Sequence, residues 1–154
     1  MNADPLTPAA VSAALQACSH DRMRRLMRRL ASHFDARLRE AGLKTTQFSL
    51  LAYLAAQGPI RPADLAHAMG IDASTLTRNL KPVAQAGWAE VVAGRDARSR
   101  LVRLTPAGRV KLAEGGARWR EAQSSLTEQL GAERIAAMHG WIDETLALLP
   151  AGED

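Results

Sequence analysis

The sequence has a single cysteine, few aromatic residues and no long apolar run. Cys18 is the only cysteine of the 154 residues, so no disulfide can form within the chain, which is compatible with a reducing cytosol. No apolar stretch approaches the roughly 20 residues that cross a bilayer. Residues 1–10 also lack the basic start and apolar stretch of a secretory signal. We therefore expect a cytoplasmic protein with no membrane partner.

Signatures of catalysis and of metal binding are also missing. The sequence contains no glycine-rich phosphate loop, nucleophile elbow or His-Glu metal motif. Asp143 and Glu144 are neighbours in sequence and lie on different faces of a helix, so they do not suggest an acid–base pair. The histidines offer no close pair of metal ligands beyond Cys18 with His20. We predict no enzyme activity, no cofactor and no metal site.

The composition favours a helical domain with a modest basic excess. Apolar residues make up 47% of the chain, which is enough for a core, and alanine, leucine and arginine dominate. The length suits one compact domain, with or without helical extensions. The formal net charge of +4 suggests an anionic partner, although many proteins without one are mildly basic.

Apolar residues at helical spacing predict a long first helix. Thr7 and Pro8 are the residue types of an N-cap and of the first helical position, and Gly42 is a typical helix end. Between them the apolar residues recur with helical period: Met23, Leu26, Met27, Leu30, Phe34 and Leu38. This single helix would present one apolar face and several arginines elsewhere.

Three shorter helices follow. The second is predicted to begin at a cap formed by Thr45 or Thr46 and to stop at Gly58-Pro59. Pro62 opens a third helix over Pro62–Met69. After a turn, Asp72 caps a fourth helix over about residues 73–86.

A β-hairpin and two further helices complete the predicted order. Trp88–Ala93 and Arg100–Leu104 are short, contain β-branched residues and flank a turn, which is typical of a hairpin. A hairpin alone is marginally stable, so this one must pack on the preceding helices, as in a winged helix. Thr105-Pro106 begins a helix to about Leu130, weakened by Gly115-Gly116 inside it. A last helix covers Ala132–Leu149.

The segment Pro62–Lys81 fits a helix-turn-helix. Gly70 can adopt the positive φ that the turn requires. Small and apolar residues are expected to close the inner face of the two helices, namely Leu65, Ala66, Met69, Ile71, Leu76, Leu80, Val83 and Ala84. A turn of this kind is found in DNA-binding proteins, although helical hairpins without DNA share parts of the pattern.

The outward side of the fourth helix favours the DNA-binding interpretation. No acidic residue occurs between Ala73 and Gln85, whereas a merely solvated helix more often mixes glutamate with lysine. Hydroxyls serve phosphates or base edges, and an arginine can bind guanine through two hydrogen bonds. The predicted DNA-binding side chains are Ser74, Thr75, Thr77, Arg78 and Lys81. Pro82 lies inside this helix, and we expect a bend there.

The hairpin turn carries a cluster of arginines. If the fourth helix lies in a major groove, the turn reaches the flanking minor groove, where Arg95, Arg98 and Arg100 would meet phosphates. Asp96 is expected to accept a hydrogen bond from a neighbouring arginine and to hold the turn so that Arg98 points outward. Arg103 lies on a predicted strand, so for this residue a plain surface role is a stronger alternative to a DNA contact than it is for the turn arginines.

These stretches resemble the MarR family, the multiple-antibiotic-resistance regulators. The resemblance rests on "LKTTQFSLLAYLA", "ADLAHAMGIDASTLTRNLKPVAQAGW" and above all "DARSRLVRLTPAG", which is similar to the Asp-x-Arg wing and Leu-Thr-x-x-Gly helix start of the family. It implies a mainly α winged helix-turn-helix protein with a small β-hairpin. It also implies a recognition helix reading bases through Ser74, Thr75, Thr77 and Arg78, with Arg98 at the wing tip supported by Asp96.

The resemblance further implies a homodimer. Residues 1–42 would form an N-terminal dimerisation helix, 43–105 the DNA-binding lobe and 106–154 the C-terminal dimerisation helices. The apolar faces of the helices at both ends of the chain also indicate a dimer, because one small winged core cannot cover them. A twofold dimer presents two reading helices about one DNA turn apart, on a pseudo-palindromic operator. The function expected is that of a ligand-released repressor.

Two inducing signals compete. Family members usually bind a small aromatic or carboxylated effector between the dimer helices and the DNA-binding lobe. That layout implies four pocket residues, His20, Arg24, Phe48 and Trp88. The alternative is that His20 and Arg24 are ordinary surface residues and that Phe48 and Trp88 belong to the core. The alternative is a redox-responsive repressor switched by oxidation of Cys18, near which arginines and a histidine would lower the thiol pKa.

Overall fold

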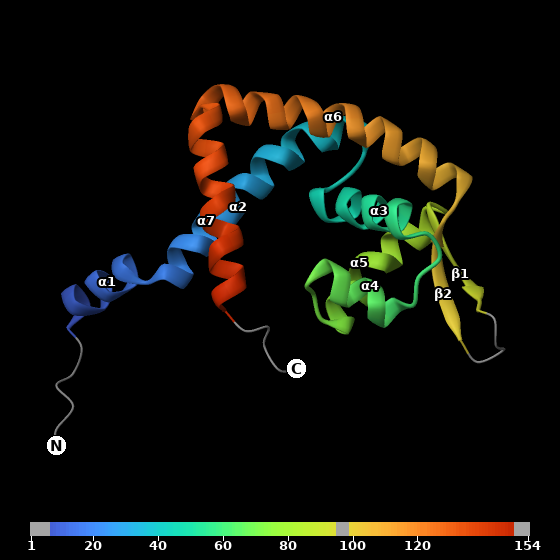
Figure 1. The fold of residues 1–154 in the computed structure, drawn as a ribbon, viewed down its shortest axis with the longest axis horizontal. Coiled ribbons are helices and arrows are strands. Elements are labelled where there is room, and N and C mark those ends of the chain that lie inside the picture. The colour runs from blue at the N-terminus through green and yellow to red at the C-terminus, as the bar shows by residue number, and fades with distance from the viewer. Residues whose placement is uncertain (1–6, 95–98, 150–154) are drawn as a thin grey trace, which may run out of the picture.

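The computed structural model describes residues 7–94 and 99–149, and it is helical apart from one two-stranded sheet (Figure 1). The elements are α1 Pro8–Ala17, α2 Ser19–Leu38, the 3-10 helix η1 Arg39–Ala41, α3 Thr45–Gln57, α4 Pro62–Met69, α5 Ala73–Gln85, β1 Ala89–Ala93, β2 Arg100–Leu104, α6 Pro106–Leu130 and α7 Ala132–Leu148. This order confirms the predicted fold class. None of the described helices combines the length and the apolar character needed to span a membrane.

The helices divide between two ends of the molecule (Figure 1). The long helix α6 runs from the hairpin at one end to α7 at the other. Helices α3, α4 and α5 lie with the hairpin below the first half of α6, whereas α1 extends away beyond α2. Helix α6 contacts both α2 and α3, so it joins the helix-turn-helix lobe to the terminal helices.

The N-terminal segment is two helices, so the prediction of one long helix was wrong. Cys18 has an extended backbone (φ −70°, ψ 113°) and separates α1 from α2. Cys18 and the next three residues all belong to types with modest or low helix propensity. Asp21 lies in the first turn of α2, where its charge favours a new helix start. The apolar residues that predicted the helix begin only at Met23, after the break, so they carried no information about the chain at Cys18.

Helix α3 is capped both by its own Gln47, which accepts from the Lys44 amide at 2.9 Å, and by a residue of α2. Its N-cap is Lys44, not Thr45 or Thr46 as predicted. Asp35 of α2 accepts hydrogen bonds from both the backbone N and the Oγ1 of Thr45, each at 2.6 Å. The Thr45 hydroxyl therefore donates to a carboxylate instead of capping the helix. A carboxylate at a helix N-terminus is also favoured by the helix dipole, so Asp35 fixes α2 to α3.

The core lies between α3, α4, α5, the hairpin and the end of α2. Its fully buried side chains include Leu38, Leu50, Leu51, Leu54, Leu65, Val83 and Val102. The predicted inner face is confirmed for Leu65, Ala66, Leu76 and Val83, while Met69, Ile71 and Leu80 pack partly buried against it. Ala84 is exposed, which corrects its predicted inward placement.

The predicted hairpin is confirmed and has an additional anchor. Strands β1 and β2 pair antiparallel, with Ala89 opposite Leu104 and Ala93 opposite Arg100. Ile60, in the loop between α3 and α4, exchanges two backbone hydrogen bonds with Val102, at 3.0 and 2.8 Å. Because two strands alone are marginal, this bridge and the burial of Val102 hold the hairpin on the lobe.

The start of α6 packs tightly on the residue before the hairpin. Thr105 caps the helix by accepting from the Gly108 amide at 3.0 Å and donates its hydroxyl to the Gly87 carbonyl at 2.6 Å. A Cβ on Gly108 would lie 2.0 Å from the Trp88 carbonyl oxygen. Gly115 is buried against Leu43 and Phe48, so it has a packing role beyond weakening the helix.

Candidate nucleic-acid interface

Helices α4 and α5 form the predicted helix-turn-helix. Gly70 takes the left-handed conformation (φ 62°, ψ 37°), and the next amide, Ile71, donates to the Ala66 carbonyl at 3.0 Å. Leu65 and Leu76 are buried where the two helices face the core. The turn therefore has the glycine conformation expected from the sequence, and it fixes which side of α5 faces outward.

The outward face of α5 is polar and cationic. Ser74, Thr77, Arg78 and Lys81 are exposed and Thr75 is half-buried, so the structure brings all five predicted side chains onto one helix surface. Helix α5 itself contains no acidic residue, and its N-cap Asp72 sits at the helix start. This face can offer hydroxyl and guanidinium hydrogen bonds to phosphates and base edges.

A hydrogen-bond chain orders the start of α5 before any partner binds. Asp72 accepts from the Ser74 Oγ at 2.5 Å, from the Thr75 amide at 2.7 Å and from the Thr75 Oγ1 at 2.7 Å. The Thr75 Oγ1 in turn accepts from an Nη of Arg78 at 2.9 Å. The Thr77 hydroxyl donates to the Ala73 carbonyl at 2.8 Å. The sequence predicted that Asp72 caps the helix, but it did not reveal that Asp72 also positions Arg78 through the Thr75 hydroxyl.

We expect this chain to make the stability of α5 depend on pH. The Ser74 hydroxyl, followed by the Thr75 groups, holds the pKa of Asp72 well below its usual range. A carboxyl whose folded pKa is depressed stabilises the fold above its ordinary value of about 4, and this contribution is lost as the pH falls below that value. Urea unfolding should show Asp72→Ala less stable than wild type at pH 7, with a smaller difference at pH 3. A constant difference at both values would contradict this assignment.

Pro82 lies inside α5, and the helix continues past it to Gln85. The Ala86 amide donates to the Pro82 carbonyl at 3.1 Å, so hydrogen bonding resumes beyond the ring. All the residues that form the polar face precede the proline, with Lys81 directly before it. The bend expected there stays a prediction.

The hairpin residues are only partly within the described chain. Arg95, Asp96 and Arg98 lie outside the described residues. Arg100 is exposed on β2. Arg103 forms an ion pair with Glu90, directly opposite on β1, at 2.8 Å, which agrees with its interpretation as a surface residue.

The four residues implied as an effector pocket come from different surroundings. His20 and Arg24 are exposed on α2. Phe48 is half-buried and stacks on Trp119 with ring centroids 6.2 Å apart, while Trp88 is half-buried with the Lys111 ammonium 5.5 Å from its ring. Their common role as a pocket stays a prediction. Cys18 is a half-buried free thiol at the junction of α1 and α2, and its redox role also stays a prediction.

Several large apolar side chains are exposed on the terminal helices. Trp141 is 50% exposed, Leu146 67% and Leu148 83%, all on α7. Others lie on α1, α2 and α6, namely Val11, Leu15, Met23, Leu26, Met27, Val110 and Trp119. Apolar exposure on this scale is typical of a surface that another chain covers.

Comparisons with known proteins agree with this geometry. Residues 41–99 match the family model described as MarR family. An uncharacterised helix-turn-helix transcriptional regulator of Bacillus subtilis, YwoH, is 31% identical over 87 residues, which cover 56% of this chain and 64% of YwoH. The chain thus spans somewhat less than two thirds of that curated relative.

Solved structures match over nearly their whole length. The transcriptional regulator MosR of M. tuberculosis, crystallised in complex with DNA, is 34% identical with a TM-score of 0.68, covering 84% of this chain and 98% of MosR. A probable transcriptional regulator from Pseudomonas aeruginosa is 26% identical with a TM-score of 0.77, covering 85% and 98%. The chain belongs to the MarR family of transcriptional regulators.

Proposed function

We propose that this protein is a homodimeric, sequence-specific DNA-binding regulator that represses transcription. The observation that carries the proposal is the outward face of α5, where hydroxyls, Arg78 and Lys81 are ordered on a helix that follows a glycine turn. Placed in a major groove, Arg78 reaches a guanine edge through two hydrogen bonds, and Ser74, Thr75 and Lys81 serve bases or phosphates. The crystal complex of the related MosR with DNA supports the same partner.

The proposed dimer uses both ends of the chain. The exposed apolar residues of α1, α2, α6 and α7 become buried when two copies pair around a twofold axis. Residues 1–42 and 106–154 then act as dimerisation helices, and residues 43–105 as the DNA-binding lobe. Two α5 helices would meet successive major grooves of a pseudo-palindromic operator, with hairpin arginines Arg95, Arg98 and Arg100 on the flanking backbone and Asp96 supporting the turn.

The proposed inducing signal is a small aromatic or carboxylated effector. Such a molecule releases the operator only if it binds more tightly to a dimer geometry with the wrong helix spacing. The proposed contacts are His20, Arg24, Phe48 and Trp88. Phe48 and Trp88 line the edge of the core near α6, where a bound molecule would press on the lobe.

A salt titration of operator binding tests the proposal. Fluorescence anisotropy is measured with the DNA upstream of the protein's own gene and with a scrambled duplex, between 50 and 200 mM salt. A dimer making about six or more phosphate contacts loses roughly 1,000-fold in affinity over this range. Light scattering gives the mass in parallel. A monomer that binds neither duplex at low salt contradicts the proposal.

A further inference from the structure

Arg61 occupies a helix start at which an arginine is unfavourable. It is the N-cap residue of α4, and its side chain makes no capping hydrogen bond. In α5 and α6 of the same lobe, by contrast, the N-caps Asp72 and Thr105 accept hydrogen bonds from first-turn amides. A positive charge at this end of a helix also opposes the helix dipole. The stability of α4 alone would therefore favour a serine, threonine, asparagine or aspartate at position 61.

The intrahelical partner of Arg61 holds it only weakly. The Arg61 Nε lies 4.0 Å from a carboxylate oxygen of Asp64, and the two side chains are 72% and 62% exposed. Exposed ion pairs contribute little to stability, because water screens the charges and two long side chains lose freedom. This pair does not account for an arginine at the N-cap, and it leaves the guanidinium accessible to another anion.

The backbone fixes Arg61 beside the hairpin. Ile60 exchanges two backbone hydrogen bonds with Val102 of β2, and Arg61 continues in an extended conformation (φ −67°, ψ 145°). Figure 1 shows this loop passing along β2 before it enters α4. In an antiparallel register the residue after Ile60 lies opposite the residue before Val102, so Arg61 is one step along the strand from Arg100. Two exposed arginines that are distant in sequence therefore lie at one edge of the hairpin.

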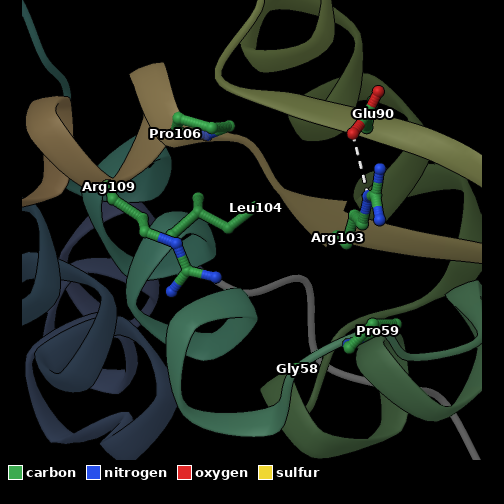
Figure 2. A pocket seen from close by; sticks show the side chains of 7 residues that line it. All are labelled: Gly58, Pro59, Glu90, Arg103, Leu104, Pro106 and Arg109. Atoms are coloured by element: carbon green, nitrogen blue, oxygen red, sulfur yellow. Dashed lines mark hydrogen bonds and ion pairs between the residues drawn. The ribbon is translucent and has the colours of Figure 1, made fainter.

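The remaining arginine of β2 is neutralised. Arg103 forms its ion pair with Glu90 at 2.8 Å, and Figure 2 shows this pair on the same hollow as Pro59 of the loop. The positive charge available where the loop meets the strand thus comes from Arg61 and Arg100. This place lies next to the hairpin and at the start of α4, the helix that leads through the glycine turn into α5.

We propose that Arg61 binds a backbone phosphate of duplex DNA. The inference rests on the proposed function and adds a contact outside the recognition helix and the hairpin. With α5 in a major groove and the hairpin at the flanking minor groove, the sugar–phosphate backbone that separates the two grooves passes between these elements. Arg61 is tied to both of them, through α4 and through β2. A phosphate contact of this kind positions the protein on DNA and carries no sequence information.

Arg61→Ser tests the inference with two readouts that move in opposite directions. Serine can cap α4, so the thermal midpoint should rise by about 2–4 °C. Anisotropy should show affinity falling roughly threefold to tenfold, by the same factor for operator and scrambled duplexes. Between 50 and 200 mM salt, the slope of log affinity against log salt should become shallower by about 0.9, the value for one phosphate contact. A purely structural role would lower the thermal midpoint and the affinity together.

Two further variants separate the contact from a general loss of charge. Arg61→Lys keeps the positive charge, so it should retain the wild-type salt slope and most of the affinity, because an ammonium serves a phosphate as a point charge. Arg120→Ala removes one exposed positive charge from α6 and should leave both the affinity and the salt slope unchanged.

Three results with Arg61→Ser would overturn the inference. The first is an affinity and a salt slope equal to those of wild type. The second is a lower thermal midpoint. The third is a larger loss on the operator than on the scrambled duplex, which would assign Arg61 to a base. If wild type binds the operator and Arg78→Ala weakens that binding, any of these results removes the Arg61 contact alone. A wild-type protein that binds neither duplex removes the proposed function, and this contact with it.

Discussion

Replacing Gly108 with alanine is expected to destabilise the protein by about 2–3 kcal/mol, the upper range for overpacking a closed site. The added Cβ would lie 2.0 Å from the Trp88 carbonyl oxygen and 2.8 Å from the Leu104 side chain. The obstacle is backbone that also accepts the Thr105 amide at 3.1 Å, so it cannot move without opening the junction of hairpin and helix. Urea unfolding followed by circular dichroism measures the loss.

Gly116→Ala is the matched control in the same helix. Its added Cβ would meet nothing closer than an Arg120 guanidinium nitrogen at 3.7 Å. Alanine is favoured over glycine in a helix by up to about 1 kcal/mol, so this variant should be more stable than wild type. If both substitutions changed the free energy of unfolding equally, the close packing around Gly108 would not be what makes alanine unfavourable there.

Replacing Arg78 with alanine is expected to reduce operator affinity by about 10- to 100-fold, the range for losing one bidentate base contact. The free protein already holds the Arg78 guanidinium on the Thr75 hydroxyl, so less side-chain entropy is lost on binding. Anisotropy with operator and scrambled duplexes measures the effect. The loss should be larger for the operator, because a base contact carries sequence information and a phosphate contact does not.

Arg78→Lys separates charge from shape. It keeps the positive charge but cannot form the paired hydrogen bonds of a guanidinium, so it should restore binding to the scrambled duplex more than to the operator. Arg120→Ala, an exposed arginine of α6, controls for loss of net charge and should change affinity little. An equal loss on both duplexes with Arg78→Ala would assign this residue to the phosphate backbone.

Much of the fold could be predicted because its boundaries depend on local chemistry. Pro62, Asp72 and Thr105 mark helix starts through effects within a single turn, and the structure begins helices at each. Gly70 was recognisable because its turn requires a positive φ. The polar face of α5 was also predictable from local information, because helical spacing alone places its residues on one side of the helix.

The features that were missed depend on contacts between distant residues. The cap of α3 comes from Asp35, ten positions before Thr45, and the hairpin anchor joins Ile60 to Val102. The need for glycine at position 108 arises from the carbonyl of Trp88, which no periodic pattern reveals. The place of Arg61 beside β2 likewise exists only after the loop and the strand have met.

The Asp35 cap constrains how this molecule can change shape. Sliding α2 along α3 would break the two hydrogen bonds that the Asp35 carboxylate accepts from Thr45, at the start of α3. The two helices are therefore expected to move together as a rigid body. Across the extended backbone at Cys18, by contrast, the Arg22 Nε of α2 donates one exposed hydrogen bond to the Gln16 carbonyl of α1, at 2.7 Å. Rotation at Cys18 that redirects α1 against the rest of the chain therefore has to break this one exposed hydrogen bond, whereas moving α2 against α3 has to break two.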